Sequence, residues 1–244
     1  MKKILCLFSA LTLVLTSCSN EDSASDSAPV TLLKKTVDTY SDGSTLTTNF
    51  NYNGNKFVSA INDSGEGNVY WTYTGDLITK MEFKLDDGTL VQKNTFVYDS
   101  NNKLVSFVRI EVADKLGFKE TYVYNTDGSI SVNAYSGDDK TQTTVNGTGT
   151  VTFHGGEVSK IVSTYGVTHT YLYDAKNNPF KNVLGCNKIA FVDGEAEGVL
   201  HNVISETNGD VLNFSSVFTY NAEGFPLTCI EASLSEVIST EFFY

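Results

Sequence analysis

One short phrase recurs along this chain and limits the folds it can adopt more than any other feature. An aromatic residue is followed by a polar turn rich in Asp, Asn and Gly, and then by Leu, Phe, Val or Ile. Its seven copies begin at Tyr52, Tyr73, Tyr98, Tyr124, Phe153, Tyr173 and Tyr220. Successive copies are 20 to 29 residues apart, except for a gap of 47 residues before the last one. Repetition at this period indicates one supersecondary unit that is used many times.

The chemistry of the phrase is that of a β-hairpin turn. Asp and Asn side chains bond to the backbone two residues on, and Gly adopts the positive φ that tight turns need. A second class of turn lies between the copies, as at Asp42-Gly43, Asp87-Gly88 and Asn208-Gly209. The chain therefore reverses twice per period. This predicts an all-β fold, an antiparallel up-and-down meander of about 16 strands with the two classes of turn at opposite ends.

The end of the chain predicts that this meander closes. Residues 236–244 form an apolar strand without Lys or Pro, and an exposed edge of that kind would pair with another chain. We expect it to pair instead with the first strand, within residues 31–40, to give a closed or nearly closed barrel. Side chains alone do not fill a circular barrel of that size, so it should be flattened or plugged by bulky aromatic residues. Binding would then belong to end loops, including 174–185 and 192–202, and not to a through-channel.

The N-terminus predicts export and a lipid anchor. Two lysines precede an apolar run, Ile4 to Leu15, that is too short to span a bilayer, so residues 1–17 are expected to be a signal peptide. The residues before Cys18 resemble the cleavage box of bacterial lipoproteins, which implies that Cys18 becomes the lipidated first residue. The alternative is an ordinary secretory signal that contains a cysteine.

Residues 18–30 are polar and acidic and predict a flexible tether, followed by a single β domain over 31–244. The acidic run resembles the surface-export signal of Bacteroidetes lipoproteins and implies an outer-membrane protein on the cell surface, with the periplasmic face as the alternative. The net charge of −12 argues against nucleic acid as a partner. No basic amphipathic helix is present to bind anionic lipid, so membrane attachment should depend on the acyl anchor.

The tyrosine–aspartate phrase resembles the YD repeats of RHS-type proteins. With "YDAKNNPFKNVLGCNKIAF" at 173–191 and "HNVIS" at 201–205, the whole chain is similar to Bacteroidetes lipoproteins of unknown function that have a porin-like barrel fold. The resemblance implies fold and compartment, and it transfers no catalytic or binding residue.

Two groups of residues could form sites in the domain. Cys186 and Cys229 could form a disulfide in an oxidising exterior, or could remain two buried thiols. Asp193, Glu195 and Glu197 alternate with small residues and could wrap a calcium ion, or could belong to a solvated acidic loop.

The sequence carries no motif for catalysis or for a cofactor. His154, His169 and His201 lack the spacing of a zinc-binding helix, and no G-x-S-x-G elbow occurs. Aromatic residues could stack on sugars, although most are needed for the core. We therefore expect a non-enzymatic envelope lipoprotein that binds a glycan, peptide or protein through its end loops. The alternatives are a glycoside hydrolase with two carboxylates about 5–10 Å apart, or an integral outer-membrane barrel with an outward apolar band.

Overall fold

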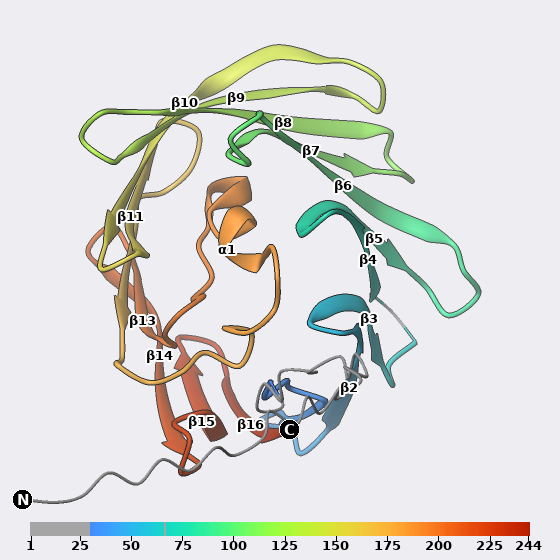
Figure 1. Ribbon diagram of the computed structural model, residues 1–244, viewed down its shortest axis with the longest axis vertical. Coiled ribbons are helices and arrows are strands. Elements are labelled where there is room, and N and C mark those ends of the chain that lie inside the picture. The colour runs from blue at the N-terminus through green and yellow to red at the C-terminus, as the bar shows by residue number, and fades with distance from the viewer. Residues whose placement is uncertain (1–29, 66) are drawn as a thin grey trace, which may run out of the picture.

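The chain forms a closed barrel of sixteen antiparallel strands, in which each strand lies beside its neighbours in sequence (Figure 1). The computed structural model describes residues 30–65 and 67–244. The predicted meander and its strand number are confirmed. The predicted signal peptide, the lipidated Cys18 and nearly all of the tether lie outside the described residues.

The strands alternate with short turns, and helical structure is confined to one long connection after β12. No helix in the described part of the chain is both long enough and apolar enough to cross a membrane. The elements are β1 (Lys35–Thr39), β2 (Thr45–Asn53), β3 (Lys56–Asn62), β4 (Asn68–Thr74), β5 (Leu77–Lys84), β6 (Leu90–Tyr98), β7 (Leu104–Glu111), β8 (Leu116–Tyr124), β9 (Ile130–Asp138), β10 (Gln142–His154), β11 (Glu157–Ser163), β12 (His169–Tyr173), α1 (Cys186–Ile189), a 3-10 turn (Val192–Gly194), β13 (Val203–Asn208), β14 (Val211–Tyr220), β15 (Pro226–Ser233) and β16 (Val237–Phe243).

The barrel closes where the sequence predicts. Strand β1 pairs antiparallel with β16 along its whole length, from Lys35 opposite Phe243 to Thr39 opposite Ser239. One further backbone bond of 2.7 Å joins the N–H of Lys34 to the carbonyl of Phe243. Neither end of the sheet is therefore left as an exposed edge.

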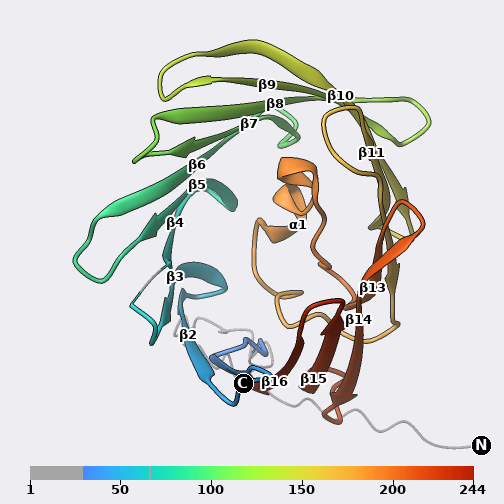
Figure 2. The ribbon, with the colours of Figure 1, turned by 180° about the vertical axis from the view of Figure 1, so that it is seen from behind.

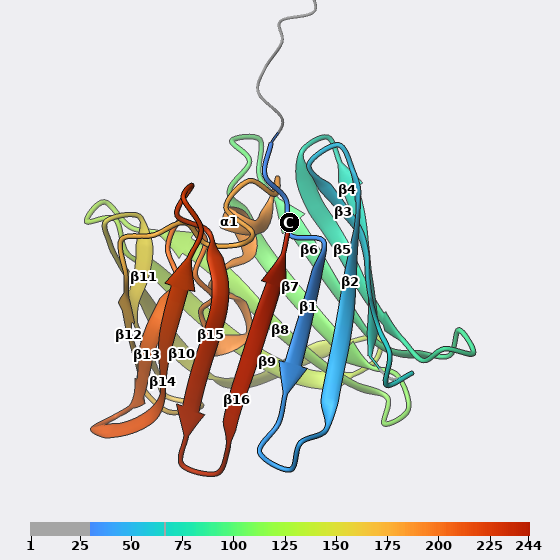
Figure 3. The ribbon, with the colours of Figure 1, turned by 90° about the horizontal axis from the view of Figure 1, so that it is seen from below.

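The two classes of turn lie at opposite ends of the barrel, as expected from the antiparallel order. The end with the aromatic-led turns also carries Val30, the first described residue, and the C-terminus at Tyr244 (Figure 3). We call it the proximal end. The other end, with the Asp-Gly turns such as the one after β1, is the distal end.

The repeated tyrosines hold neighbouring strands together at the proximal end. In six of the seven copies the pairing register shifts at the aromatic residue, because the following strand carries one extra residue there. The Tyr98 hydroxyl donates to the carbonyl of Ile78 at 2.7 Å, and the Tyr173 hydroxyl donates to that of Val158 at 2.7 Å. Burial raises the pKa of both tyrosines, so each phenol remains a donor. These bonds explain why the phrase usually begins with Tyr and not with Phe.

The inner face of the barrel is apolar, and the outer face is largely polar. The buried core contains aromatic and aliphatic residues that include Phe96, Phe107 and Tyr122. Outside, one cross-strand row runs through Thr72, Lys80, Thr95, Val108 and Lys119. Such rows mix charged, hydroxyl and aliphatic side chains, so they form no continuous apolar band within the described residues.

Candidate functional site

The long connection between β12 and β13, residues 174–202, folds back into the barrel and lies inside it (Figures 1 and 2). We call this segment the plug. The expectation that 174–185 and 192–202 are loops at the barrel end was therefore wrong. The physical reason is the width of the barrel, because wall side chains alone cannot keep the inner face of sixteen strands dry.

Aromatic contacts hold the plug to the wall on two sides. Phe191 is 5% exposed and presents its ring edge-on to Tyr122, with the centroids 5.3 Å apart. Phe180 makes edge contacts with Phe50 and Phe57, each with centroids 5.4 Å apart. Edge-to-face packing is the arrangement that the ring quadrupole favours.

At Gly185, the turn into α1 approaches the wall closely. Its φ is +83°, and a Cβ there would lie 3.0 Å from the Ile78 side chain and 3.1 Å from the Asp76 carbonyl. Only glycine combines this backbone conformation with such a close approach.

Two buried carboxylates anchor the backbone of the plug. Glu157, which is 4% exposed, accepts hydrogen bonds from the N–H groups of Leu200 and His201, each at 2.7 Å, and from that of Val199 at 3.3 Å. Glu120 accepts from the Asp193 N–H at 2.9 Å.

Two phenols complete the shell around Glu120. The hydroxyls of Tyr122 and Tyr165 both donate to its carboxylate. Burial raises the pKa of Glu120, while the hydrogen bonds from these tyrosines and from the Asp193 N–H oppose that rise. Both anchoring carboxylates therefore use their oxygens for structure.

The plug divides the lumen into two open chambers. The first chamber, about 600 Å³, lies between the plug and strands β2 to β7. Trp71 and Phe57 stack in its wall with their ring centroids 4.5 Å apart. Phe83, Arg109 and Glu195 also line it. The wall is thus predominantly apolar, with seven aromatic residues and a few charged groups, a composition typical of small-molecule sites.

The second chamber, about 450 Å³, lies between the plug and strands β1 and β13 to β16. Phe214, Phe218 and Phe242 line it together with the carboxyl-bearing residues Asp38 and Glu231. Phe180, Glu197 and Gly198 of the plug border both chambers. The second chamber reaches the distal rim at Tyr40, in the turn that follows β1.

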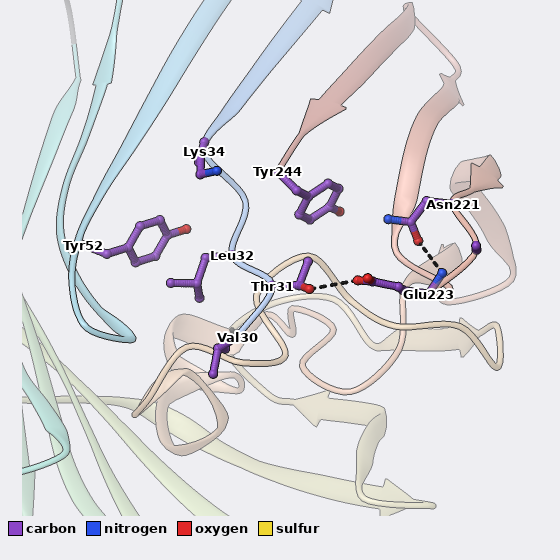
Figure 4. A pocket seen from close by; sticks show the side chains of 9 residues that line it. Val30, Thr31, Leu32, Lys34, Tyr52, Asn221, Glu223 and Tyr244 are labelled. Atoms are coloured by element: carbon purple, nitrogen blue, oxygen red, sulfur yellow. Dashed lines mark hydrogen bonds between the residues drawn. The ribbon is translucent and has the colours of Figure 1, made fainter. Parts of the chain in front are cut away.

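A third cavity, about 570 Å³, lies at the proximal end where the two ends of the chain meet (Figure 4). Tyr52 and Tyr244 both line it, and Thr31 donates a hydrogen bond of 2.8 Å to Glu223 across it. Val30, the first described residue, forms part of its wall.

The three acidic residues predicted as a cation site lie on the plug, inside the barrel and not on an outer loop. Asp193 forms an ion pair with Arg109 on β7. Burial raises the pKa of Asp193, an effect that Arg109 opposes. Glu195 and Glu197 face the chambers. Across residues 30–65 and 67–244, no three Asp, Glu, His or Cys side chains are grouped so as to hold a metal ion.

The two cysteines are free thiols. Cys186 begins α1 in the plug and packs against the core, whereas Cys229 lies on β15 in the wall of the second chamber. The sequence is compatible with a disulfide or with two buried thiols, and the structure has two unpaired thiols. Burial raises the pKa of both thiols to about 12, so neither is a thiolate at neutral pH.

The three histidines are separated in the structure. His169 pairs with Glu206 on the neighbouring strand, and His201 Nδ1 lies 3.5 Å from the Glu157 carboxylate. His154 ends β10 at the proximal end.

The sequence alone did not predict a role for two residues of the second chamber. Asp38 and Glu231 lie on different strands near the two ends of the barrel sequence, and closure brings them to one wall. The only local signal was an acidic residue on the same strand face as Cys229.

No family model matches this chain, and no curated protein matches it. Among solved structures, it is similar to a porin-like protein from Bacteroides vulgatus ATCC 8482, with 12% identity, a TM-score of 0.55 and coverage of 88% of this chain and 99% of that chain. It is also similar to a porin-like protein from Bacteroides uniformis ATCC 8492, with 10% identity, a TM-score of 0.48 and coverage of 86% and 97%. At 12% identity the first likeness shows a shared barrel fold, and the expected porin-like fold is thereby confirmed.

Proposed function

We propose that this protein is a non-enzymatic envelope lipoprotein, attached to the outer membrane through Cys18, that takes a small ligand into the chambers beside its plug. The observation that carries the proposal is the first chamber, where the partly exposed rings of Phe50, Trp71 and Phe83 border an open volume inside the barrel. Aromatic walls left uncovered by the protein's own side chains are typical of ligand sites.

The polarity of the wall supports a lipid anchor over insertion by strands. A barrel that spans a membrane presents an apolar band to lipid and keeps polar residues inside. In this barrel the inner face carries Phe96, Phe107 and Trp71, while Lys80 and Lys119 project outward at mid-height. Glu82 lies between Lys80 and Lys84 on the same outer face, with ion pairs of 3.0 and 3.2 Å. Such a surface is suited to water.

The position of Val30 supports an orientation. The twelve Cα–Cα steps from Cys18 to Val30 span about 43 Å at most, so a lipid on Cys18 would keep the proximal end near the bilayer. The distal end, where the second chamber reaches the rim, would then face away from the membrane. On the cell surface, the location implied by the acidic tether, a ligand would enter from outside.

The roles of the buried carboxylates support binding over hydrolysis. A glycoside hydrolase needs two carboxyl groups free to act on one bond. Glu157 and Glu120 are engaged by backbone N–H groups of the plug, and Asp193 is paired with Arg109. Glu157, Glu120 and Asp193 therefore hold the plug in place, whereas Asp38, Glu197 and Glu231 line the second chamber.

Trp71, the single tryptophan, provides a test because it lines the first chamber. The lipidated protein would be reconstituted in phosphatidylcholine vesicles and titrated with 4-nitrobenzyl alcohol, a neutral aromatic quencher. We expect saturable quenching of Trp71 emission, which an apolar ligand in the chamber would reverse. Quenching that rises linearly without saturation, as for a tryptophan in free contact with solvent, would show that the chamber binds no such ligand.

A further inference from the structure

The second chamber combines aromatic rings with carboxylates and contains no basic residue. Its rings are Tyr40, Phe180, Phe214, Phe218 and Phe242, which come from β14, β16, the plug and the turn after β1. Its carboxyl groups are those of Asp38, Glu197 and Glu231. No Lys, Arg or His lines the chamber.

Few hydrogen bonds and no ion pairs from the described residues stabilise the negative charge of these carboxyl groups. Asp38 accepts a hydrogen bond of 2.7 Å from Thr240, and Glu231 accepts a long one of 3.4 Å from Ser216. None of the three acids belongs to an ion pair among the described residues. Burial raises the pKa of Glu231, and the negative charges of Glu206 and Asp38 raise it further. An uncompensated acidic cavity attracts cations.

On the strands beside this chamber, aliphatic side chains project outward while an acid faces inward. Val217 is 70% exposed and Ile230 is 53% exposed on the outer face, while Ser216 and Glu231 face the chamber. A stability optimum would place the aliphatic residues inside and the acid outside. Keeping Glu231 inside costs stability, and a ligand that pairs with it would offset that cost.

The rings of the chamber are also free to receive a cation. Every Lys–ring and Arg–ring contact of the described chain uses other rings, such as Phe243 and Tyr135. An aromatic face within about 6 Å of an ammonium group attracts it, most strongly where water is excluded.

From this combination we infer that the second chamber binds an organic cation, an ammonium or quaternary ammonium group carried on an apolar body. The inference rests on the proposed function, since it names the ligand class for one of the two chambers. A bare metal ion fits less well, because the acids of the described residues do not converge as a metal site. In the chamber wall, Asn202 is 2% exposed and its Oδ1 has no hydrogen-bond partner among the described residues, which leaves an acceptor for the N–H of an ammonium ligand.

Isothermal titration calorimetry on the lipidated protein in phosphatidylcholine vesicles tests the ligand class. The titrants are benzyltrimethylammonium, neutral phenylacetamide and anionic phenylacetate, which share a phenyl ring and differ in charge. We expect benzyltrimethylammonium to bind about tenfold more tightly than phenylacetamide, and phenylacetate to bind least. Glu231→Gln should weaken the cation about tenfold and leave phenylacetamide unchanged.

Two further variants distinguish a specific loss of cation binding from misfolding. Phe242→Leu keeps an apolar wall but removes a ring, and should weaken the cation alone. Glu241→Gln changes an exposed carboxylate on the outer face of the same strand and should change neither affinity. Equal affinity for the cation and phenylacetamide would overturn the ligand class while leaving lumen binding intact. Saturable Trp71 quenching without any cation binding would also overturn it, whereas failure of both assays would overturn the proposed function.

Discussion

The anchoring of the plug by Glu157 yields the sharpest test of the architecture. One carboxylate, 4% exposed, receives three consecutive backbone N–H groups, those of Val199, Leu200 and His201. These residues return the plug to β13. Replacing Glu157 with Gln preserves the size of the side chain and removes its charge.

The cost can be worked out from these contacts. A Gln oxygen can keep the two bonds of 2.7 Å, but its NH₂ group must then face the Val199 N–H, donor against donor. Hydrogen bonds to charged groups contribute about 1.5–3 kcal/mol each, so losing one bond and the charge should cost about 2–3 kcal/mol. For a domain of this size, that corresponds to a fall in Tm of about 4–12 °C.

Thermal unfolding and amide hydrogen exchange together measure the effect. We expect the lower Tm, and faster exchange at residues 199–201 than in the parent, because local opening of the plug becomes easier. Glu241→Gln, on the outer face, is the matched control and should change neither measurement. If Glu157→Gln leaves both the Tm and the exchange of these three amides unaltered, the carboxylate does not hold the plug and the reasoning is refuted.

Cys18→Ala should move the protein from the membrane to the soluble fraction; its retention on membranes after a carbonate wash would favour a spanning barrel. Gly54→Val should cost about 1–2 kcal/mol, because φ is +61° there and no atom crowds the site, so the strain lies in the backbone alone. Gly54→Asn should cost less, and equal Tm values for the two variants would contradict that source of strain. Tyr98→Phe should cost about 1 kcal/mol through the lost bond to a carbonyl of the neighbouring strand, whereas Tyr135→Phe on the outer face should be neutral. Burial raises the pKa of Glu197 above its ordinary 4.5, so the folded state loses stability as the pH rises through and above that value. Glu197→Gln should therefore raise the Tm at about pH 7 and leave it unchanged at about pH 4; the same gain at both values would exclude titration as the cause.

The sequence was sufficient to predict the wall of the barrel because each part of the wall is specified locally. A Tyr, a polar turn and an apolar residue define each proximal hairpin, and the alternation through Val69, Trp71 and Tyr73 places one face inward. Even the closure of β1 on β16 followed from an edge that needed a partner. The register shift at six of the seven aromatic residues was not predictable, because it depends on the pairing between two strands and not on the local pattern.

The plug could not be predicted, because nothing local distinguishes it from a surface loop. Its inward-packing residues Phe180, Val183 and Phe191, of which the last two are buried, have no period of two or of 3.6, so no regular element was expected. Their burial results from the width of a barrel formed by residues far away in sequence. The gap of 47 residues between Tyr173 and Tyr220 equals about two periods of the repeat, and in the structure it contains the plug and the β13–β14 hairpin.

The chambers also result from the width of the barrel, which residues far apart in the sequence determine. The residues that line them show that the wall is not optimised for stability alone. A plug of 29 residues covers much of the inner face of sixteen strands and leaves two volumes, about 600 and 450 Å³. Stability alone would have lined both with aliphatic residues, as in the core around Ile161 and Val151. The second chamber instead keeps Glu231 inside while Ile230 projects into solvent at 53% exposure. Uncompensated acids inside a barrel are a cost to folding, and a cationic ligand is the kind of partner that would offset it.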